Sequence, residues 1–133
     1  MPATNAPKFH PWSSEESFRY LVENIADYSI FMLDPQGRIA SWNKGAERQF
    51  GFSEKEIIGK GFDVLFTEED REKGEPQKEI NMAKKEGRAP DRRFHLHKNG
   101  SKFFVDGTLV PMRDDFGNVS GFIKLIHKIS EVP

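Results

Sequence analysis

The sequence predicts a single α+β domain built on an antiparallel sheet. At 133 residues the chain is long enough for one ordinary hydrophobic core but not for two. Apolar residues recur at helical spacing in the N-terminal and central parts, whereas the C-terminal third consists of short apolar runs separated by turn residues. The expected order is one helix, two strands, short helices, a longer helix and three strands, which is typical of an α+β sheet.

The N-terminal region divides into an arm and a helix. Residues 1–12 carry three prolines and few core-forming residues, so we expect a disordered arm or linker. Residues 13–27 begin with serines and glutamates suited to a helix start, and Phe18, Leu21, Val22 and Ile25 follow at helical spacing. We expect an amphipathic helix over Ser17–Ala26.

Five strands are predicted from alternating apolar runs. The first two, 29–34 and 37–43, are joined by the turn residues Pro35-Gln36-Gly37 and are expected to form a hairpin. The other three form a meander with turns at Asn99-Gly100 and at 115–118, and they are expected near Arg92–His97, Lys102–Met112 and Val119–Ile129.

The stretch between the hairpin and the meander carries the signals of several helices. Asn43 and Gly51 bracket a helix over Lys44–Phe50 as N-cap and left-handed C-cap. Ser53 and Glu56 form a capping-box pattern for a second helix, which Gly59 ends. Helices this short are marginal alone in water, so we expect both to pack on the sheet.

A longer helix follows these two short ones. Thr67 and Asp70 repeat the capping spacing, and Pro76 suits the first turn of a helix that ends at Gly87. The acidic run 68–70 at this helix start is interpreted as a solvated match to the helix dipole rather than as an acid–base pair.

Composition excludes several functional classes. Twenty basic and 21 acidic residues give a formal charge of −1, so nucleic acid is not an expected partner. Cysteine is absent, which excludes disulfides and thiolate chemistry. No apolar run approaches the roughly 20 residues that span a bilayer. We expect a cytoplasmic protein without membrane insertion.

Two segments, "LDPQGRIASWNKGAERQFGFSEKEIIGK" and "HKNGSKFFVDGTLVPMRDDFGNVSGFIKLIHKISE", together resemble a Per-Arnt-Sim (PAS) sensory domain of the kind found in bacterial sensor histidine kinases. The resemblance implies a PAS domain over 28–131, with a five-stranded antiparallel sheet, short helices over one face and a small cavity between them. It further implies a signal-sensing and dimerisation module that is not itself an enzyme. The module would pass a signal to a C-terminal effector, a histidine kinase, in the same parent chain.

The resemblance also limits the cofactors that this domain can be expected to bind. Phe62 stands where flavin-binding blue-light relatives carry a reactive cysteine, which excludes a cysteinyl-flavin adduct, and a chromophore linked through cysteine is excluded as well. The predicted long helix has no histidine for an axial haem bond. No cofactor or a small non-covalent ligand is therefore expected. The alternative is a redox or gas sensor that binds flavin or haem without cysteine.

Alignment of the second meander strand with ligand-binding PAS relatives sets which residues face the cavity. In this alignment Phe103 faces the cavity. His95 and Lys124 also turn inward, where an anionic or hydrogen-bonding ligand, or water, would be needed to accompany them. The candidate pocket residues are Phe31, Leu33, Trp42, Phe50, Ile58, Phe62, Leu65, His95, Val105, Gly107, Leu109, Lys124 and Ile126.

The opposite face of the sheet is then apolar and needs a cover. In PAS domains the usual cover is a second copy, with the N-terminal helices packed between the sheets, so a homodimer is expected. The candidate interface residues are Phe18, Leu21, Val22, Ile25, Phe104, Ile123 and Leu125.

No metal site is predicted. His95 and His97 share one face of a strand, but no third ligand is adjacent, and structural zinc takes four ligands.

The junction after the last strand departs from the family pattern. Family members often carry an Asp-Ile-Thr-like sequence there, and here Lys128-Ile129-Ser130 has lysine in place of the acid.

Overall fold

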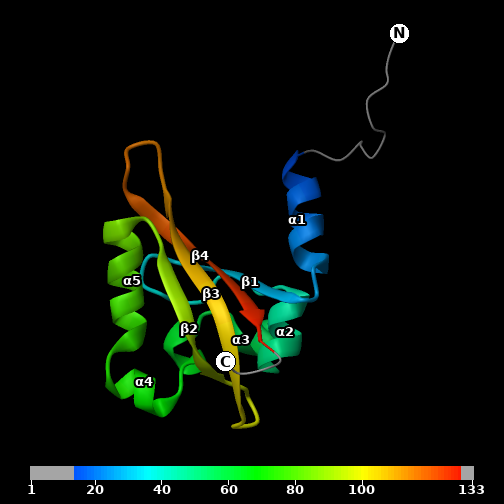
Figure 1. Ribbon diagram of the computed structural model, residues 1–133. Coiled ribbons are helices and arrows are strands. Elements are labelled where there is room, and N and C mark those ends of the chain that lie inside the picture. Colours follow the sequence, from blue (N-terminus) through cyan, green and yellow to red (C-terminus); the bar gives the residue numbers. More distant parts are fainter. Residues whose placement is uncertain (1–13, 130–133) are drawn as a thin grey trace.

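A computed structural model describes residues 14–129. The helical segments are α1 (Ser14–Asn24), α2 (Lys44–Phe50), α3 (Glu54–Ile57), the 3-10 turn η1 (Phe62–Leu65), α4 (Glu68–Glu72) and α5 (Glu75–Glu86). The strands are β1 (Tyr28–Leu33), β2 (Ala89–Leu96), β3 (Lys102–Arg113) and β4 (Val119–Lys128). Figure 1 shows these elements along the chain. The predicted arm 1–12 lies outside the described residues.

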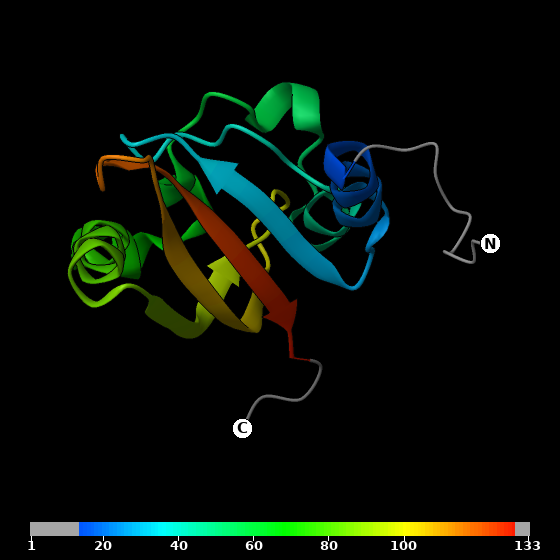
Figure 2. The same cartoon turned by 90° about the horizontal axis from the view of Figure 1, so that it is seen from above.

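The four strands form one antiparallel sheet in the order β1-β4-β3-β2. β4 therefore lies in the middle, between the first strand and the long hairpin partner β3. Figure 2 shows α2, α3 and η1 on one side of this sheet, while along most of the width of the other side no helix lies within residues 14–129. The α+β class predicted from the sequence is confirmed.

The predicted fifth strand, 37–43, is not a strand of this sheet. Residues 33 and 39 form only an isolated bridge. Ile39 instead pairs with the loop after α3, since its N–H donates to the Lys60 carbonyl at 2.8 Å and its own carbonyl accepts from Gly59 at 2.8 Å. The predicted hairpin therefore turns away from β1 after one bridge and ties the short helices to the sheet.

The predicted caps hold the short helices in place. The Asn43 side chain accepts from the Ala46 N–H, and Gly51 ends α2 in the left-handed conformation. Ser53 and Glu56 form the reciprocal capping box of α3. α5 begins at Glu75, so that Pro76 lies in its first turn, and it ends before Gly87 as predicted.

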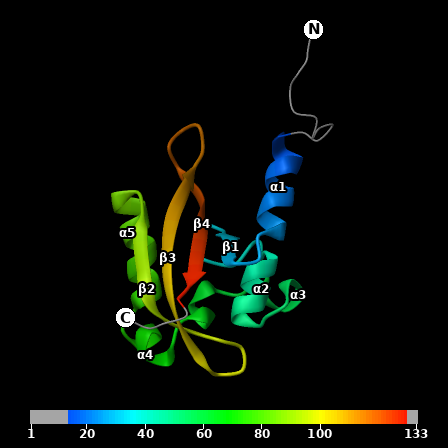
Figure 3. The same cartoon turned by 45° about the vertical axis from the view of Figure 1, so that its right-hand side comes forward.

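The N-terminal helix extends over Ser14–Asn24 rather than Ser17–Ala26, and none of its residues is buried. Asn43 attaches its C-terminal end to the domain, because the amide nitrogen donates to the carbonyls of Val22, Ile25 and Tyr28 at 3.0 to 3.1 Å. Figures 1 and 3 show α1 projecting from the domain beside α2. The helix thus covers only part of the apolar sheet face that it was expected to shield.

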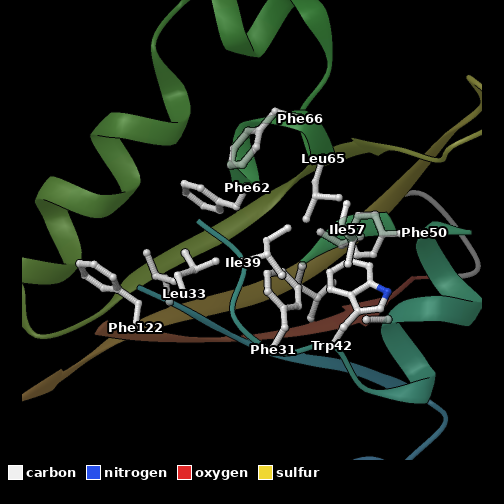
Figure 4. Packing of buried hydrophobic residues seen from close by; sticks show 14 of the residues in the cluster. Phe31, Leu33, Ile39, Trp42, Phe50, Ile57, Phe62, Leu65, Phe66 and Phe122 are labelled. Carbon is white, nitrogen blue, oxygen red and sulfur yellow. The ribbon is translucent and has the colours of Figure 1, made fainter. Parts of the chain in front are cut away.

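The core fills the space between the sheet and the short helices. Figure 4 shows Phe31, Trp42 and Phe50 packed together, with ring centroids 4.9 Å apart for Phe31 and Trp42 and 5.7 Å apart for Trp42 and Phe50. The Trp42 indole donates to the Phe52 carbonyl at 2.9 Å, which satisfies its only polar group. Trp42 is therefore a core residue with a fixed orientation.

Candidate functional site: an interior ion cluster and an apolar outer face

The strand alignment predicted from the sequence agrees with the observed burial. Phe103, Val105, Gly107 and Leu109 are buried on the inner face, whereas Phe104 and Val110 alternate with them and are half-buried on the outer face. His95 and Lys124 are both buried, as that alignment requires.

Twelve of the thirteen predicted pocket residues are buried between the sheet and the helices: Phe31, Leu33, Trp42, Phe50, Phe62, Leu65, His95, Val105, Gly107, Leu109, Lys124 and Ile126. The prediction is wrong for Ile58, which is 40% exposed. Ile58 is the C-cap of α3 and its neighbour Ile57 takes the buried position.

Gly107 provides close contact between strands rather than space for a ligand. A Cβ atom there would lie 2.9 Å from the Leu125 carbonyl oxygen and 3.1 Å from Cγ1 of Ile126. Since Leu125 and Ile126 belong to the neighbouring strand β4, a larger side chain at this position would strike the sheet itself before reaching a cavity.

Lys124 is the centre of a buried ion cluster that joins three elements. From β4, its ammonium group contacts Oε2 of Glu79 on α5 and Oδ2 of Asp91 on β2, the latter at 2.7 Å. The ammonium nitrogen also lies 5.7 and 5.8 Å from the ring centroids of Phe62 and Phe66, where the ring faces attract a cation. All three charged side chains are at most 1% exposed.

His95 extends the cluster to the 3-10 turn. Its Nε2 lies 2.7 Å from Asp91 Oδ2, and its Nδ1 lies 2.8 Å from the carbonyl oxygen of Leu65 in η1. Its ring packs edge-on against Phe66 and Phe50, at centroid distances of 4.8 and 5.8 Å. The imidazole is thus held from both sides.

Arg93 links the cluster to the start of the helical segment. Its Nε contacts Asp91 Oδ1, and its terminal nitrogens lie 3.2 Å from Asp70 of α4 and 3.6 Å from Glu75 of α5. Asp91 therefore accepts from a lysine and an arginine and also contacts a histidine, and the chain's own charges connect α4 and α5 to the sheet.

Burial and the neighbouring charges shift the two carboxyl groups in opposite directions. Burial raises the pKa of Glu79 above its ordinary value, and the charge of Lys124 only partly opposes this. Burial would also raise the pKa of Asp91, but the charges of Lys124 and His95 and their hydrogen bonds outweigh it and hold that pKa well below the ordinary value. Glu79 Oε1 has no hydrogen-bond partner although it is buried.

The cluster changes the interpretation of the inward-facing cations. The sequence alone suggested an anionic ligand or water beside His95 and Lys124, and the partners in the structure are Asp91 and Glu79. A flavin or haem at this place would have to displace buried ion pairs and packed aromatic rings, so the interior in this conformation does not fit either cofactor.

The sequence contained a signal for both carboxylates. Glu79 shares a helix face with the buried Ile80 and Ala83, and Asp91 has the same strand parity as His95. Asp91 was missed because the strand was expected to begin at Arg92, whereas β2 begins at Ala89 despite Pro90 at its second position.

The outer face of the sheet carries the second candidate site. A groove of about 270 Å³ lies between α1 and the sheet, lined on its apolar side by Phe18, Val22, Ile30, Met32, Trp42 and Ile123. Phe18 and Leu21 of α1 are 67% and 59% exposed, and Leu125 on β4 is 42% exposed. Of the other predicted interface residues, Ile25 is exposed and Val22, Phe104 and Ile123 are half-buried.

Two further properties concern the described part of the chain. Within residues 14–129, no three histidine or acidic side chains are grouped in a way that could hold a metal ion. Over the same range, no helix combines the length and the apolar character needed to cross a bilayer.

Comparison with known proteins gives two curated relatives that are regulatory proteins. Two-component system protein A of Emericella nidulans is 38% identical over 116 residues, which is 87% of this chain and 17% of that protein. The methanogenesis regulatory histidine kinase FilI of Methanothrix harundinacea is 28% identical over 119 residues, which is 90% of this chain and 13% of that protein. The chain thus spans less than one fifth of the length of either relative.

The fold has close counterparts among solved structures. A PAS domain from Colwellia psychrerythraea superimposes with a TM-score of 0.77 at 24% identity, covering 86% of this chain and 96% of that one. The PAS domain profile matches residues 27–131, which include the whole sheet, the short helices and the ion cluster. The chain therefore belongs to the PAS domain family.

Proposed function

We propose that this domain is a regulatory sensor and dimerisation module of a signal-transduction protein, detecting a small ligand or a partner and passing the signal to a C-terminal effector, a histidine kinase. Membership of the PAS family carries this proposal. The two relatives support it, since one is a two-component system protein and the other a regulatory histidine kinase, and in each the matching segment is a small part of the protein.

β4 is the element best suited to transmit a signal. Its residues alternate between the two faces, so that Lys124 contacts the interior carboxylates while its neighbours Ile123 and Leu125 lie on the apolar outer face. A rearrangement of the ion cluster would therefore act on the strand that carries the outer surface. Because β4 is the last strand, a C-terminal effector would be connected to the domain through it.

We propose a second copy of this chain as the partner of the outer face. α1 presents exposed apolar residues beside a groove of the same character, and one molecule leaves both uncovered. An isologous dimer would bury the two helices and the two sheet faces together.

Light scattering over a concentration series tests the dimer. The parent should approach twice the monomer mass as concentration rises. Leu125→Glu should remain monomeric, because a charge in the buried contact loses its hydration without gaining a partner. Phe116→Glu is the matched control, since Phe116 is 89% exposed on the β3–β4 turn, away from this face. A parent that stays monomeric at its highest soluble concentration contradicts the proposed interface.

The regulatory role is tested in a fusion. A histidine-kinase core joined after residue 133 should autophosphorylate at a rate that Leu125→Glu changes and Phe116→Glu does not. If both variants leave the rate equal to that of the parent fusion, the domain does not control the kinase through this face. The flavin or haem alternative is tested separately, by a visible absorption spectrum of the protein purified from cells.

A further inference from the structure

The hydrogen-bond geometry fixes the protonation of the buried cluster. Asp91 accepts at both oxygens, from Arg93 at Oδ1 and from Lys124 at Oδ2. A proton on either oxygen would face a donor, so Asp91 is a carboxylate. The Leu65 carbonyl oxygen can only accept.

It follows that both ring nitrogens of His95 donate. Nδ1 donates to the Leu65 carbonyl oxygen at 2.8 Å and Nε2 donates to Asp91 Oδ2 at 2.7 Å. A neutral imidazole has one donor and one acceptor nitrogen, so it satisfies only one of these contacts and points a lone pair at an oxygen in the other. The packing therefore requires a doubly protonated, charged ring.

When Asp91 and Glu79 are both ionised, the charges around His95 balance while the ring keeps this proton. Lys124 on β4 and the ring carry positive charge, and Asp91 on β2 and Glu79 on α5 can each carry negative charge. Arg93 on β2 is matched across the cluster edge by Asp70 of α4 and Glu75 of α5. The groups packed on the ring from α2 and η1, Phe50, Phe66 and the Leu65 carbonyl, are uncharged.

We propose that His95 makes the domain a proton sensor: the packing of η1 and α5 against the sheet depends on the doubly protonated ring and loosens when the ring loses a proton. Loss of the proton points a ring-nitrogen lone pair at one of the two oxygens, Asp91 Oδ2 or the Leu65 carbonyl oxygen, and leaves excess negative charge inside the domain while Asp91 and Glu79 are both ionised. Histidine exchanges its proton between about pH 5 and 8, so the loosening follows a rise in pH. This inference rests on the proposed sensor function and names its stimulus.

Ring nitrogen NMR on the folded parent tests the protonation directly. We expect both His95 nitrogens to show the signature of a charged ring in the folded protein at the lower end of the range from about pH 5 to 8. A neutral His95 ring in the folded protein under those conditions overturns the proposal. This measurement needs no variant.

Hydrogen exchange tests the structural consequence. After division by the intrinsic exchange rate, opening of α5 and η1 in the parent should increase by up to about tenfold per pH unit between pH 6 and 8, the limit for one proton. His95→Gln should lose this slope. His127→Gln should keep it, because the His127 ring is exposed, stacks on Tyr28 and takes no part in the ion cluster.

Glu79→Gln separates the two titrating groups of the cluster. If His95 carries the sensing proton, this variant keeps the slope between pH 6 and 8. A slope that disappears with Glu79→Gln and survives His95→Gln assigns the proton to Glu79 and overturns the proposal. The dimer and fusion experiments compare variants of the outer face at one fixed pH, so failure of the proposed function can be distinguished from failure of this inference.

Discussion

Replacing Lys124 by methionine should destabilise the domain strongly, because methionine keeps most of the volume of the side chain and removes its charge. Asp91 and Glu79 are at most 1% exposed and lose their shared cation. Removing one partner from a buried ion pair typically costs about 3–5 kcal/mol, since the other charge stays buried and unpaired. For a domain of this size that corresponds to a fall in Tm of roughly 10–20 °C.

The loss should depend on pH. In the parent, the depressed pKa of Asp91 contributes stability that is present above its ordinary value of 3.8 and is lost as the pH falls through the lower folded value. Lys124 is one source of that depression. The raised pKa of Glu79 acts in the opposite sense, because an ionised Glu79 becomes costly as the pH rises above 4.5, and more so without a cation beside it. The difference in stability between parent and variant should therefore widen with pH.

Urea unfolding of the parent and Lys124→Met from pH 4 to pH 8 measures this difference. Lys98→Met is the matched control, since Lys98 pairs with Glu56 at the surface and the two side chains are 51% and 37% exposed. An exposed pair contributes at most about 1 kcal/mol. A Lys124→Met variant that loses no more stability than the Lys98 control, at any pH in this range, would refute the reasoning.

Three further substitutions and one control substitution test the local structure by urea unfolding. Ser53→Ala should cost about 0.5–2 kcal/mol by removing one half of the α3 capping box, and an unchanged midpoint would mean that the cap contributes nothing. Asn43→Asp should cost more than about 1 kcal/mol although aspartate is an equally good cap, because its oxygen would face three carbonyls that now accept from the amide; stability equal to the parent would contradict this. Gly107→Ala should cost about 1–3 kcal/mol through its contact with β4, whereas Asp106→Ala, on the exposed face, should cost less than 1 kcal/mol; equal losses would contradict the strand alignment.

Local signals allowed the caps of the short helices α2 and α3 to be predicted correctly. Asn43 with Gly51 and Ser53 with Glu56 act within a few residues of one another, so nothing distant can overrule them. The prediction of a fifth strand was wrong for the opposite reason, because it depended on a distant partner. Residue 39 has the pattern of a strand but pairs with the loop at 59–60, and a pairing partner in a distant loop is not visible in the local pattern.

The sequence predicted the two inward-facing cations of the interior site but not the carboxylates that pair with them. Side-chain alternation placed His95 and Lys124 inside, and the cost of burying them correctly required partners. Those partners come from α5 and from a strand residue just before the expected start of β2, so their approach depends on how the helix packs across the sheet. Spacing in the sequence indicates that Glu79 and Asp91 face inward, but the packing of the whole core determines that they pair with Lys124.

The ion cluster and the apolar outer face both include residues of β4, and this shared strand determines how the two sites would be coupled. Consecutive residues of β4 face opposite sides, with Lys124 in the ion cluster and Leu125 on the outer face. β4 is also hydrogen-bonded on both edges, to β1 and to β3, so it cannot shift without its neighbours. His95 and Lys124 both contact Asp91, so a change of charge at His95 should change the strength of the Asp91–Lys124 ion pair. We expect β4 to respond by a change in twist, which would move the residues on both of its faces. Dimer affinity should therefore vary with pH in the parent and become independent of pH in His95→Gln, although α1 and Leu125 do not contact His95.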